Sequence, residues 1–198
     1  DLEFWLKKMY SGDPRMSDHY IRRKVKELYP KHEYPKDSPL ARSFWAADRV
    51  ETDFAYACPA ERTSAAFSSK NVAIPTWSED AAVYQYRFAA SASANGTALH
   101  GDELPFVWLD GGHTSVAQRP ELADTMASFG VNFAKTQNPN LGHALPSGTP
   151  KWPAWTRKKR YVMQFVAAKH HHAVVLKDGV DRKRCEELWT KNWDFFGK

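Results

Sequence analysis

The sequence contains little cysteine and no long hydrophobic run. Only two cysteines occur in 198 residues, and no stretch of 18 apolar residues is present, so the sequence predicts no membrane-spanning helix. The cysteines lie 185 − 58 = 127 positions apart, which excludes the close ligand spacing of a zinc site. Internal repeats and low-complexity segments are also absent. We therefore expect no metal ion and no other cofactor.

The composition is typical of a globular protein with a sizeable core. Hydrophobic residues make up 42% of the chain, charged residues 26% and aromatic residues 14%. A chain of this length normally forms one domain, so residues 1–198 are expected to form a single unit. The aromatic residues favour a large core, and an alternative is that some of them line an apolar pocket for a substrate.

The net charge of +5 raises the question of an acidic partner. Basic residues cluster at 22–24, 157–160 and 182–184. No nucleic-acid-binding motif accompanies them and acidic residues are interspersed, so we interpret them as solvated helix ends and turns. The sequence predicts no nucleic-acid partner.

The apolar patterning predicts more helix than strand. Helices are expected from Ser17 to Pro30, from Pro39 to Ala57, from Pro59 to about Ser69, from Pro120 to Asn138 and from Asp181 to Phe196, with Cys58-Pro59 breaking the second from the third. Leu122, Met126, Phe129 and Phe133 would form one apolar face. Strands are expected at Val83–Phe88 and Tyr161–Val166, the second at a sheet edge. Two or three strands alone make a poor sheet, so the pattern indicates part of a larger one.

Three segments resemble one known family. They are Ala98-Leu99-His100-Gly101-Asp102-Glu103-Leu104-Pro105-Phe106-Val107-Trp108, then Asn132–Asn140, then Lys151-Trp152-Pro153 leading into Tyr161. In this order they resemble the type-B carboxylesterase/lipase family, which includes the cholinesterases. The resemblance implies an α/β fold, as the helix-rich C-terminal portion of an α/β-hydrolase that holds the last strands of its central sheet.

The resemblance also shows what is missing from this chain. Members of the family carry a nucleophilic serine on a Gly-x-Ser-x-Gly elbow and a glycine loop for the oxyanion, and neither motif is present here. The resemblance therefore implies that residues 1–198 are the C-terminal segment of one carboxylesterase domain, either one chain of a nicked enzyme or a truncated form. An N-terminal chain would supply the serine, and the isolated chain is expected to be inactive.

His100 is the candidate catalytic residue. The resemblance implies that it takes the serine proton and returns it to the leaving alcohol. The resemblance implies that Glu103 is buried near the site and supports its hydrogen-bond network and electrostatics. It could also be an ordinary carboxylate that caps a turn. The third member of the triad is expected just before residue 1, with Glu3 as the second choice; Asp102 is too close to His100 in sequence.

The two cysteines allow two readings. Taken alone they would be free buried thiols, whereas the resemblance implies a disulfide between Cys58 and Cys185 and an oxidising compartment. Asn95-Gly96-Thr97 is a glycosylation sequon, so Asn95 is a candidate glycan site and weak support for secretion. The resulting prediction is a secreted protein or one that resides in another oxidising compartment of the secretory pathway.

The remaining histidines suggest a metal site only at first sight. Successive side chains of His170-His171-His172 point apart on a regular strand, so we expect this run to form a surface turn. We expect His113 to be a loop residue.

The preferred function is hydrolysis of carboxylic esters. The alternatives are a non-catalytic, cholinesterase-like adhesion or interaction module and, more distantly, a small-molecule-binding domain.

Overall fold

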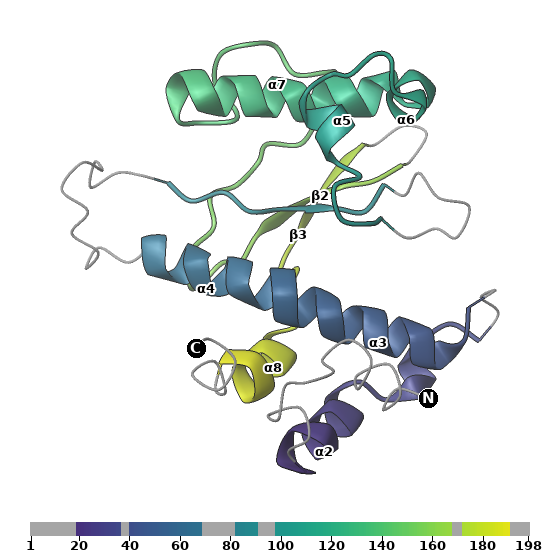
Figure 1. The fold of residues 1–198 in the computed structure, drawn as a ribbon. Helices are drawn as coiled ribbons and strands as arrows, with labels where there is room; N and C mark the ends of the chain where they lie inside the picture. Colours follow the sequence, from purple (N-terminus) through teal and green to yellow (C-terminus); the bar gives the residue numbers. More distant parts are fainter. Residues whose placement is uncertain (1–18, 37–39, 69–81, 91–97, 168–171, 191–198) are drawn as a thin grey trace. The chain divides into compact units, whose positions relative to one another are not determined.

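The computed structural model describes residues 19–36, 40–68, 82–90, 98–167 and 172–190 (Figure 1). The chain divides into two compact units. Unit 1 combines Asp1–Thr63 with Val180–Lys198, and unit 2 is the intervening stretch Ser64–Gly179. Unit 1 is therefore built from two pieces of chain that are far apart in sequence.

Helices make up the described part of unit 1. Helix α2 spans His19–Leu28 and ends before Pro30, as the sequence predicts, while the predicted start at Ser17 lies outside the described residues. A short 3-10 helix η2 (Lys31–Glu33) follows Pro30. The C-terminal piece contributes α8 (Arg182–Arg184) and the π-helical turn η4 (Cys185–Thr190). The side chain of Asp181 accepts a hydrogen bond from the Arg184 N–H and so caps the helix that was predicted to begin at Asp181.

The predicted break at Cys58-Pro59 is wrong. Helix α3 (Arg42–Thr52) passes through the π-helical segment η3 (Asp53–Ala57) directly into α4 (Cys58–Phe67) (Figure 1). Proline disrupts an α-helix because it removes one N–H and clashes with the carbonyl four residues earlier. In a π-helix each N–H bonds to the carbonyl five residues earlier instead of four, and the Cys58 N–H bonds in this way to the Asp53 carbonyl. The helical run therefore continues past Pro59.

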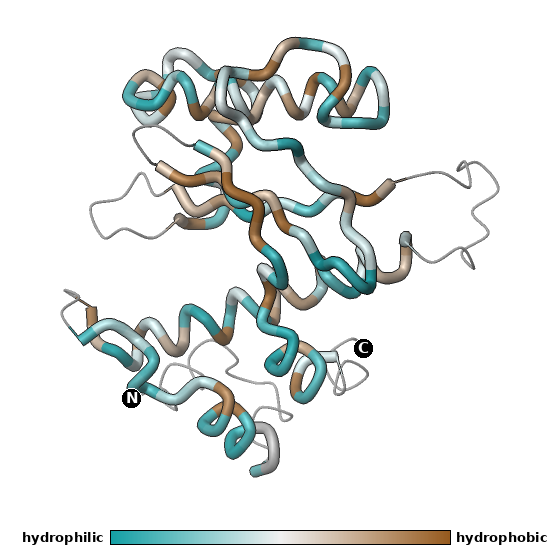
Figure 2. Tube along the Cα trace, turned by 180° about the vertical axis from the view of Figure 1, so that it is seen from behind, coloured by the Kyte–Doolittle hydropathy of each residue, from teal (hydrophilic) through white to brown (hydrophobic). Residues whose placement is uncertain are grey.

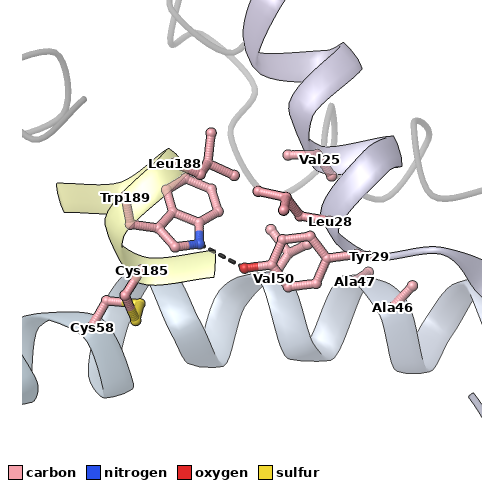
Figure 3. Close-up of a cluster of buried hydrophobic side chains, with 10 residues drawn as sticks. All are labelled: Val25, Leu28, Tyr29, Ala46, Ala47, Val50, Cys58, Cys185, Leu188 and Trp189. Carbon is pink, nitrogen blue, oxygen red and sulfur yellow. Dashed lines mark hydrogen bonds between the residues drawn. A yellow bond between two sulfur atoms is a disulfide. The ribbon is translucent and has the colours of Figure 1, made fainter. Parts of the chain in front are cut away.

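The core of unit 1 is closed by a disulfide. Its buried residues are Val25, Leu28, Tyr29, Ala46, Ala47, Val50, Cys58, Cys185, Leu188 and Trp189 (Figure 3). Cys58 and Cys185 are bonded, with their Cα atoms 5.3 Å apart, and this confirms the expected pairing. The bond joins the two pieces of chain from which the unit is made.

Unit 2 contains a three-stranded sheet in the order β1-β2-β3. Strand β1 (Tyr86–Phe88) runs parallel to β2 (Val162–Phe165), and β3 (Ala173–Leu176) runs antiparallel to β2. The prediction that Tyr161–Val166 is a sheet edge is wrong, since β2 is the central strand of the described sheet. The edge prediction failed because β3, an apolar run after the histidines, was not recognised as a strand.

Helices α5 (Leu104–Val107), α6 (Thr114–Gln118) and α7 (Pro120–Thr136) lie on one side of this sheet (Figure 1). In α7, Leu122, Met126 and Phe129 are buried as predicted. Phe133 is 46% exposed, so its predicted place on the buried face is wrong. Asn132, one residue earlier, is fully buried instead.

The second core joins these helices to the sheet. Its buried members include Phe106, Leu122, Phe129, Met163 and Phe165. The hydropathy trace shows the apolar strands of the sheet with hydrophilic turns around them (Figure 2). The ring of Trp152 lies 5.2 Å from Phe129 and 5.7 Å from Phe165 in edge-to-face contacts, a geometry that stabilises aromatic pairs. The many aromatic residues of unit 2 thus serve largely as core.

Candidate active site around His100

His100 lies in a tight turn from Leu99 to Asp102. The Asp102 N–H donates to the Leu99 carbonyl at 3.2 Å, and the Asp102 carboxylate accepts from the Leu99 N–H at 2.8 Å. Gly101 adopts a φ of +87°, a backbone conformation that side chains with a Cβ rarely adopt. The glycine beside the histidine is therefore required by the turn, and Asp102 holds the turn closed.

The next residues fasten this turn to the core of unit 2. The Leu104 N–H donates to the Gly101 carbonyl at 3.1 Å, which leads directly into α5. Within α5, Phe106 is fully buried and its ring lies 5.3 Å from that of Phe88 at the end of β1. The strand before His100 and the helix after it are thus packed against each other.

Exposed apolar side chains lie near His100 in the sequence. His100 itself is exposed, and three neighbouring large apolar side chains are exposed as well: Leu99 by 60%, Leu104 by 51% and Trp108 by 77%. Several exposed apolar side chains close together in one segment are typical of a surface that contacts a partner or a ligand.

Glu103 lies at the N-cap position of α5 without capping it through its side chain. Burial raises the pKa of Tyr86, and the charge of Glu103 raises it further. The negative charge of Glu103 therefore influences Tyr86 in β1. The Asp102 carboxylate accepts from the Leu99 N–H and so holds the backbone of the His100 turn.

The other two resembling segments form a hydrogen-bonded frame. Asn132 donates to the carbonyls of Pro139 and His143 at 3.1 and 3.0 Å and accepts from the His143 N–H at 2.6 Å. Asn140 pairs with both backbone groups of Trp152, at 2.8 and 2.7 Å. These side-chain amides hold the long loop after α7. Asn132 was not predicted from the sequence, although a polar amide on the apolar face of a predicted helix could have indicated it.

Trp152 then links this frame to the strand that leads to His100. Its indole N–H donates to the Gln85 carbonyl at 3.2 Å, immediately before β1. The three segments with family resemblance therefore belong to one connected structure, in which the second and third support the strand and the helix that flank the first.

The remaining histidines have structural positions. His113 caps α6, with its Nδ1 2.6 Å from the Ser115 Oγ, so it is a helix cap and not only a loop residue. The His172 Nε2 lies within hydrogen-bond distance of the Glu121 carboxylate, at 2.8 Å, while His170 and His171 lie outside the described residues. Among the residues that the structure describes, no group of three or more His, Cys, Asp or Glu side chains could hold a metal ion.

Two further candidates fall outside what the structure describes. Glu3 and Asn95 both belong to undescribed segments. Over the described ranges, no helix is both long and apolar enough to cross a membrane.

Two shallow hollows lie in unit 2, and His100 lines neither of them. One has a volume of about 410 Å³ and is bordered by Ser68, Val83, Trp155 and Arg157 among others. The second, about 530 Å³, lies over α7 beside Leu145.

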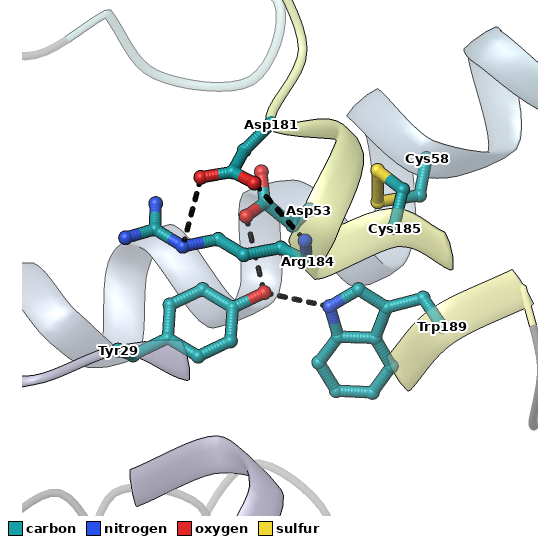
Figure 4. Close-up of a disulfide and its surroundings, with 7 residues drawn as sticks. All are labelled: Tyr29, Asp53, Cys58, Asp181, Arg184, Cys185 and Trp189. Carbon is teal, nitrogen blue, oxygen red and sulfur yellow. Dashed lines mark hydrogen bonds and ion pairs between the residues drawn. A yellow bond between two sulfur atoms is a disulfide. The ribbon is translucent and has the colours of Figure 1, made fainter. Parts of the chain in front are cut away.

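Unit 1 holds a buried polar network beside the disulfide (Figure 4). The Trp189 indole N–H donates to the Tyr29 hydroxyl at 2.7 Å, and that hydroxyl donates to Asp53 at 3.1 Å. Burial raises the pKa of Asp53 to about 6, against the lowering effect of Arg49, the Tyr29 hydrogen bond and Arg184. Burial also raises the pKa of Tyr29. The network thus joins Tyr29, Asp53 and Trp189 within the core of unit 1.

Comparisons with known proteins agree with the resemblance. The model of the carboxylesterase family matches residues 3–187, and the chain belongs to this family. Secreted lipase 4 of Gibberella zeae is 26% identical over 172 residues, which cover 83% of this chain and 28% of that protein.

Solved structures show the same fold. The chain is similar to PNB esterase with a TM-score of 0.58 at 24% identity, covering 92% of this chain and 32% of that one. It is similar to carboxylesterase EST55 of Geobacillus stearothermophilus with a TM-score of 0.59 at 24% identity, covering 90% of this chain and 35% of that one. The predicted fold, part of an α/β-hydrolase, is therefore confirmed. The chain spans about a third or less of the length of these relatives.

Proposed function

We propose that this chain is the histidine-bearing, C-terminal part of a carboxylic-ester hydrolase. The single observation that carries the proposal is the match of the carboxylesterase family model to residues 3–187, within which His100 lies on a turn between a strand and a helix. Residues 1–198 would be a segment of one carboxylesterase domain, and the serine would come from an N-terminal chain of the same enzyme.

In the proposed reaction His100 transfers protons. It would take the proton of the serine hydroxyl as the oxygen bonds to the ester carbonyl carbon, and return it to the alkoxide as the bond between carbonyl carbon and alcohol breaks. In the second half it would take a proton from water, which attacks the acyl-enzyme, and return it to the serine. The exposure of His100 fits this role, because its ring must reach a residue of another chain.

Glu103 and Asp102 would have different supporting roles. Asp102 fixes the Leu99–Asp102 turn and so the position of the imidazole. Glu103 would contribute negative charge near the site and stabilise the imidazolium that forms during the reaction. The triad acid itself would lie before residue 1, with Glu3 as the second candidate.

The exposed apolar side chains support a partner chain. Leu99, Leu104 and Trp108 would be covered by the N-terminal chain or by the apolar part of the ester, which removes them from water. The disulfide and the likeness to a protein named a secreted lipase support secretion or another oxidising compartment.

The test compares two histidine variants of the assembled enzyme, with hydrolysis of p-nitrophenyl butyrate as the readout. His100→Ala should lower kcat by at least roughly 1,000-fold, because a missing general base removes most of the triad's contribution. His113→Ala, which removes the α6 cap, should retain near-normal kcat. The isolated 198-residue chain should give no turnover.

Two outcomes would overturn the proposal. Full activity of His100→Ala would remove the catalytic role, and strong turnover by the isolated chain would remove the need for a partner. Partner binding without any ester turnover would favour the adhesion or interaction module instead.

A further inference from the structure

The hollow of about 410 Å³ in unit 2 combines apolar walls with a cationic side chain. Its apolar lining includes Ala82, Val83 and Trp155, and its polar lining includes Ser68, Thr156 and Arg157. The backbone N–H of Trp155 donates to the Val83 carbonyl at 2.7 Å, which joins the two sides of the apolar wall. The volume lies within the range of small-molecule sites, so the hollow is large enough for a ligand with an apolar body.

The indole N–H of Trp155 is a donor without an acceptor. Trp155 is only 2% exposed, and its Nε1 has no hydrogen-bond partner among the described residues. The indole N–H groups of Trp152 and Trp189, in contrast, both have acceptors. A buried donor that lacks its hydrogen bond is unfavourable. An oxygen atom of a ligand at the Trp155 wall would supply the missing acceptor.

Arg157 adds a positive charge to the same hollow. Its Nη2 donates to the Ala65 carbonyl near the end of α4, at 3.2 Å, so the side chain is anchored although it is exposed. This bond uses only one of the several N–H donors of a guanidinium. Lys158 and Lys159, which follow it, are exposed as well. An anion is therefore the favoured polar group of a ligand here.

The hydroxyl groups of the lining are already in use. The Ser68 Oγ donates to the Ala65 carbonyl at 3.3 Å, and the Thr156 Oγ1 accepts from the Lys159 N–H at 2.9 Å. The guanidinium of Arg157 and the indole of Trp155 remain as donors. A carboxylate has two oxygen atoms, one for each of these donors, whereas a phosphate group brings three strong acceptors. The lining therefore suits a carboxylate better than a phosphate.

We propose that this hollow binds a carboxylate that carries an apolar chain. The carboxylate would accept from Arg157 and from the Trp155 indole, and the chain would lie against Val83. The hollow lies beside the residues before β1, whereas His100 follows the other end of that strand. Only the source of the ligand rests on the proposed function, because hydrolysis of an ester releases an acid of this kind.

The experiment measures binding of octanoate to the assembled enzyme by titration calorimetry. Octan-1-ol lacks the charge and acetate lacks the chain, so octanoate should bind roughly tenfold or more tightly than either. Octyl phosphate should bind more weakly than octanoate, because the hollow offers few free donors. In the NMR spectrum, the indole N–H signal that disappears in Trp155→Phe should shift when octanoate is added.

Two variants and a matched control locate the bound carboxylate. Arg157→Gln should raise the Kd of octanoate roughly tenfold or more, since a charge-assisted hydrogen bond is lost. Trp155→Phe keeps an aromatic ring and removes the N–H, and should raise the Kd roughly threefold or more. Lys158→Gln removes the neighbouring charge, which does not line the hollow, and should change the Kd by less than about twofold.

Four outcomes would overturn the site. These are equal affinity for octanoate and octan-1-ol, an unchanged Kd in Arg157→Gln, an unmoved Trp155 indole signal, and an equal loss of affinity in Lys158→Gln. The second and third would also be seen if octanoate bound only at His100. Tighter binding of octyl phosphate than of octanoate would overturn the choice of a carboxylate.

The proposal and the proposed function can fail separately. Turnover that depends on His100, without octanoate binding at Trp155, would overturn this proposal alone. Octanoate binding that depends on Arg157, without ester turnover, would support the site and remove ester hydrolysis as the source of its ligand.

Discussion

The two units of this chain are stabilised by different means. Unit 1 has a hydrophobic core, a covalent bond between Cys58 and Cys185, and a buried polar network around Asp53. Unit 2 has a hydrophobic core with aromatic contacts around Trp152 and loops held by the side chains of Asn132 and Asn140, and no cysteine lies within it.

The difference follows from how each unit is assembled. Unit 1 joins two pieces of chain separated by the whole of unit 2, so the entropy lost in bringing its pieces together is large. A disulfide removes much of that cost by constraining the unfolded chain. Unit 2 is continuous in sequence, so packing and side-chain hydrogen bonds hold it, and it carries the candidate active site.

The largest effect is expected from removing the disulfide. The double variant Cys58→Ala, Cys185→Ala should destabilise unit 1 by about 2–5 kcal/mol, because a loop of 127 residues is no longer closed. Amide exchange should rise at Leu188 in unit 1 and stay unchanged at Met163 in unit 2. Equal loss of protection at both positions would show that the two units do not unfold separately.

Removal of one amide should weaken unit 2 in turn. Asn132→Ala leaves the carbonyls of Pro139 and His143 and the N–H of His143 without partners, at a cost of about 3 kcal/mol. Urea denaturation measures the change, and the exposed Lys135→Ala on the same helix serves as the control. A loss below about 0.5 kcal/mol, the range of ordinary surface substitutions, would contradict the role of Asn132.

Asp53 should make the stability of unit 1 depend on pH. Its pKa is about 6 in the folded protein and ordinarily 3.8, so the folded state binds the proton more tightly than the unfolded state. The resulting stabilisation is fully present below pH 3.8 and is lost as pH rises through about 6, a change of up to about 3 kcal/mol.

The variant Asp53→Asn should remove this dependence between pH 4 and 7, because the amide does not titrate. Thermal unfolding followed across that range measures the effect, and the exposed Glu27→Gln should leave the same profile almost unchanged. An identical profile for the wild type and Asp53→Asn would show that Asp53 does not titrate in this range.

The smallest effect is expected beside His100. Glu103 raises the pKa of Tyr86 in addition to burial, so Glu103→Gln should lower that pKa, since the neutral amide no longer disfavours the phenolate. Ultraviolet titration of the tyrosines, with Tyr86→Phe to assign the signal, measures the shift. An unchanged pKa would place the Glu103 charge too far away to support the site.

The limits of the sequence reading have physical causes. Apolar periodicity identified α2 and α7, because one helix face meets a core. It failed at Pro59 because the π-helical register that accommodates the proline is a property of the backbone and of what packs on it. It failed at Phe133 because the apolar face of α7 is wider than the surface that it packs against, so that some apolar residues stay exposed. It did not detect β3, because this strand has only four residues.

The sequence alone determined the family, the segment that carries His100, the helix-rich character and, through the resemblance, the cysteine pairing. These depend on local patterns of residue type, which a chain carries with it before it folds. The folded structure was needed to show that β2 is the central strand of the described sheet, that Asn132 and Asn140 hold the loop against Trp152, and that Asp53 is buried beside Tyr29. Each of these depends on residues distant in sequence meeting in space, and no local pattern records such a meeting.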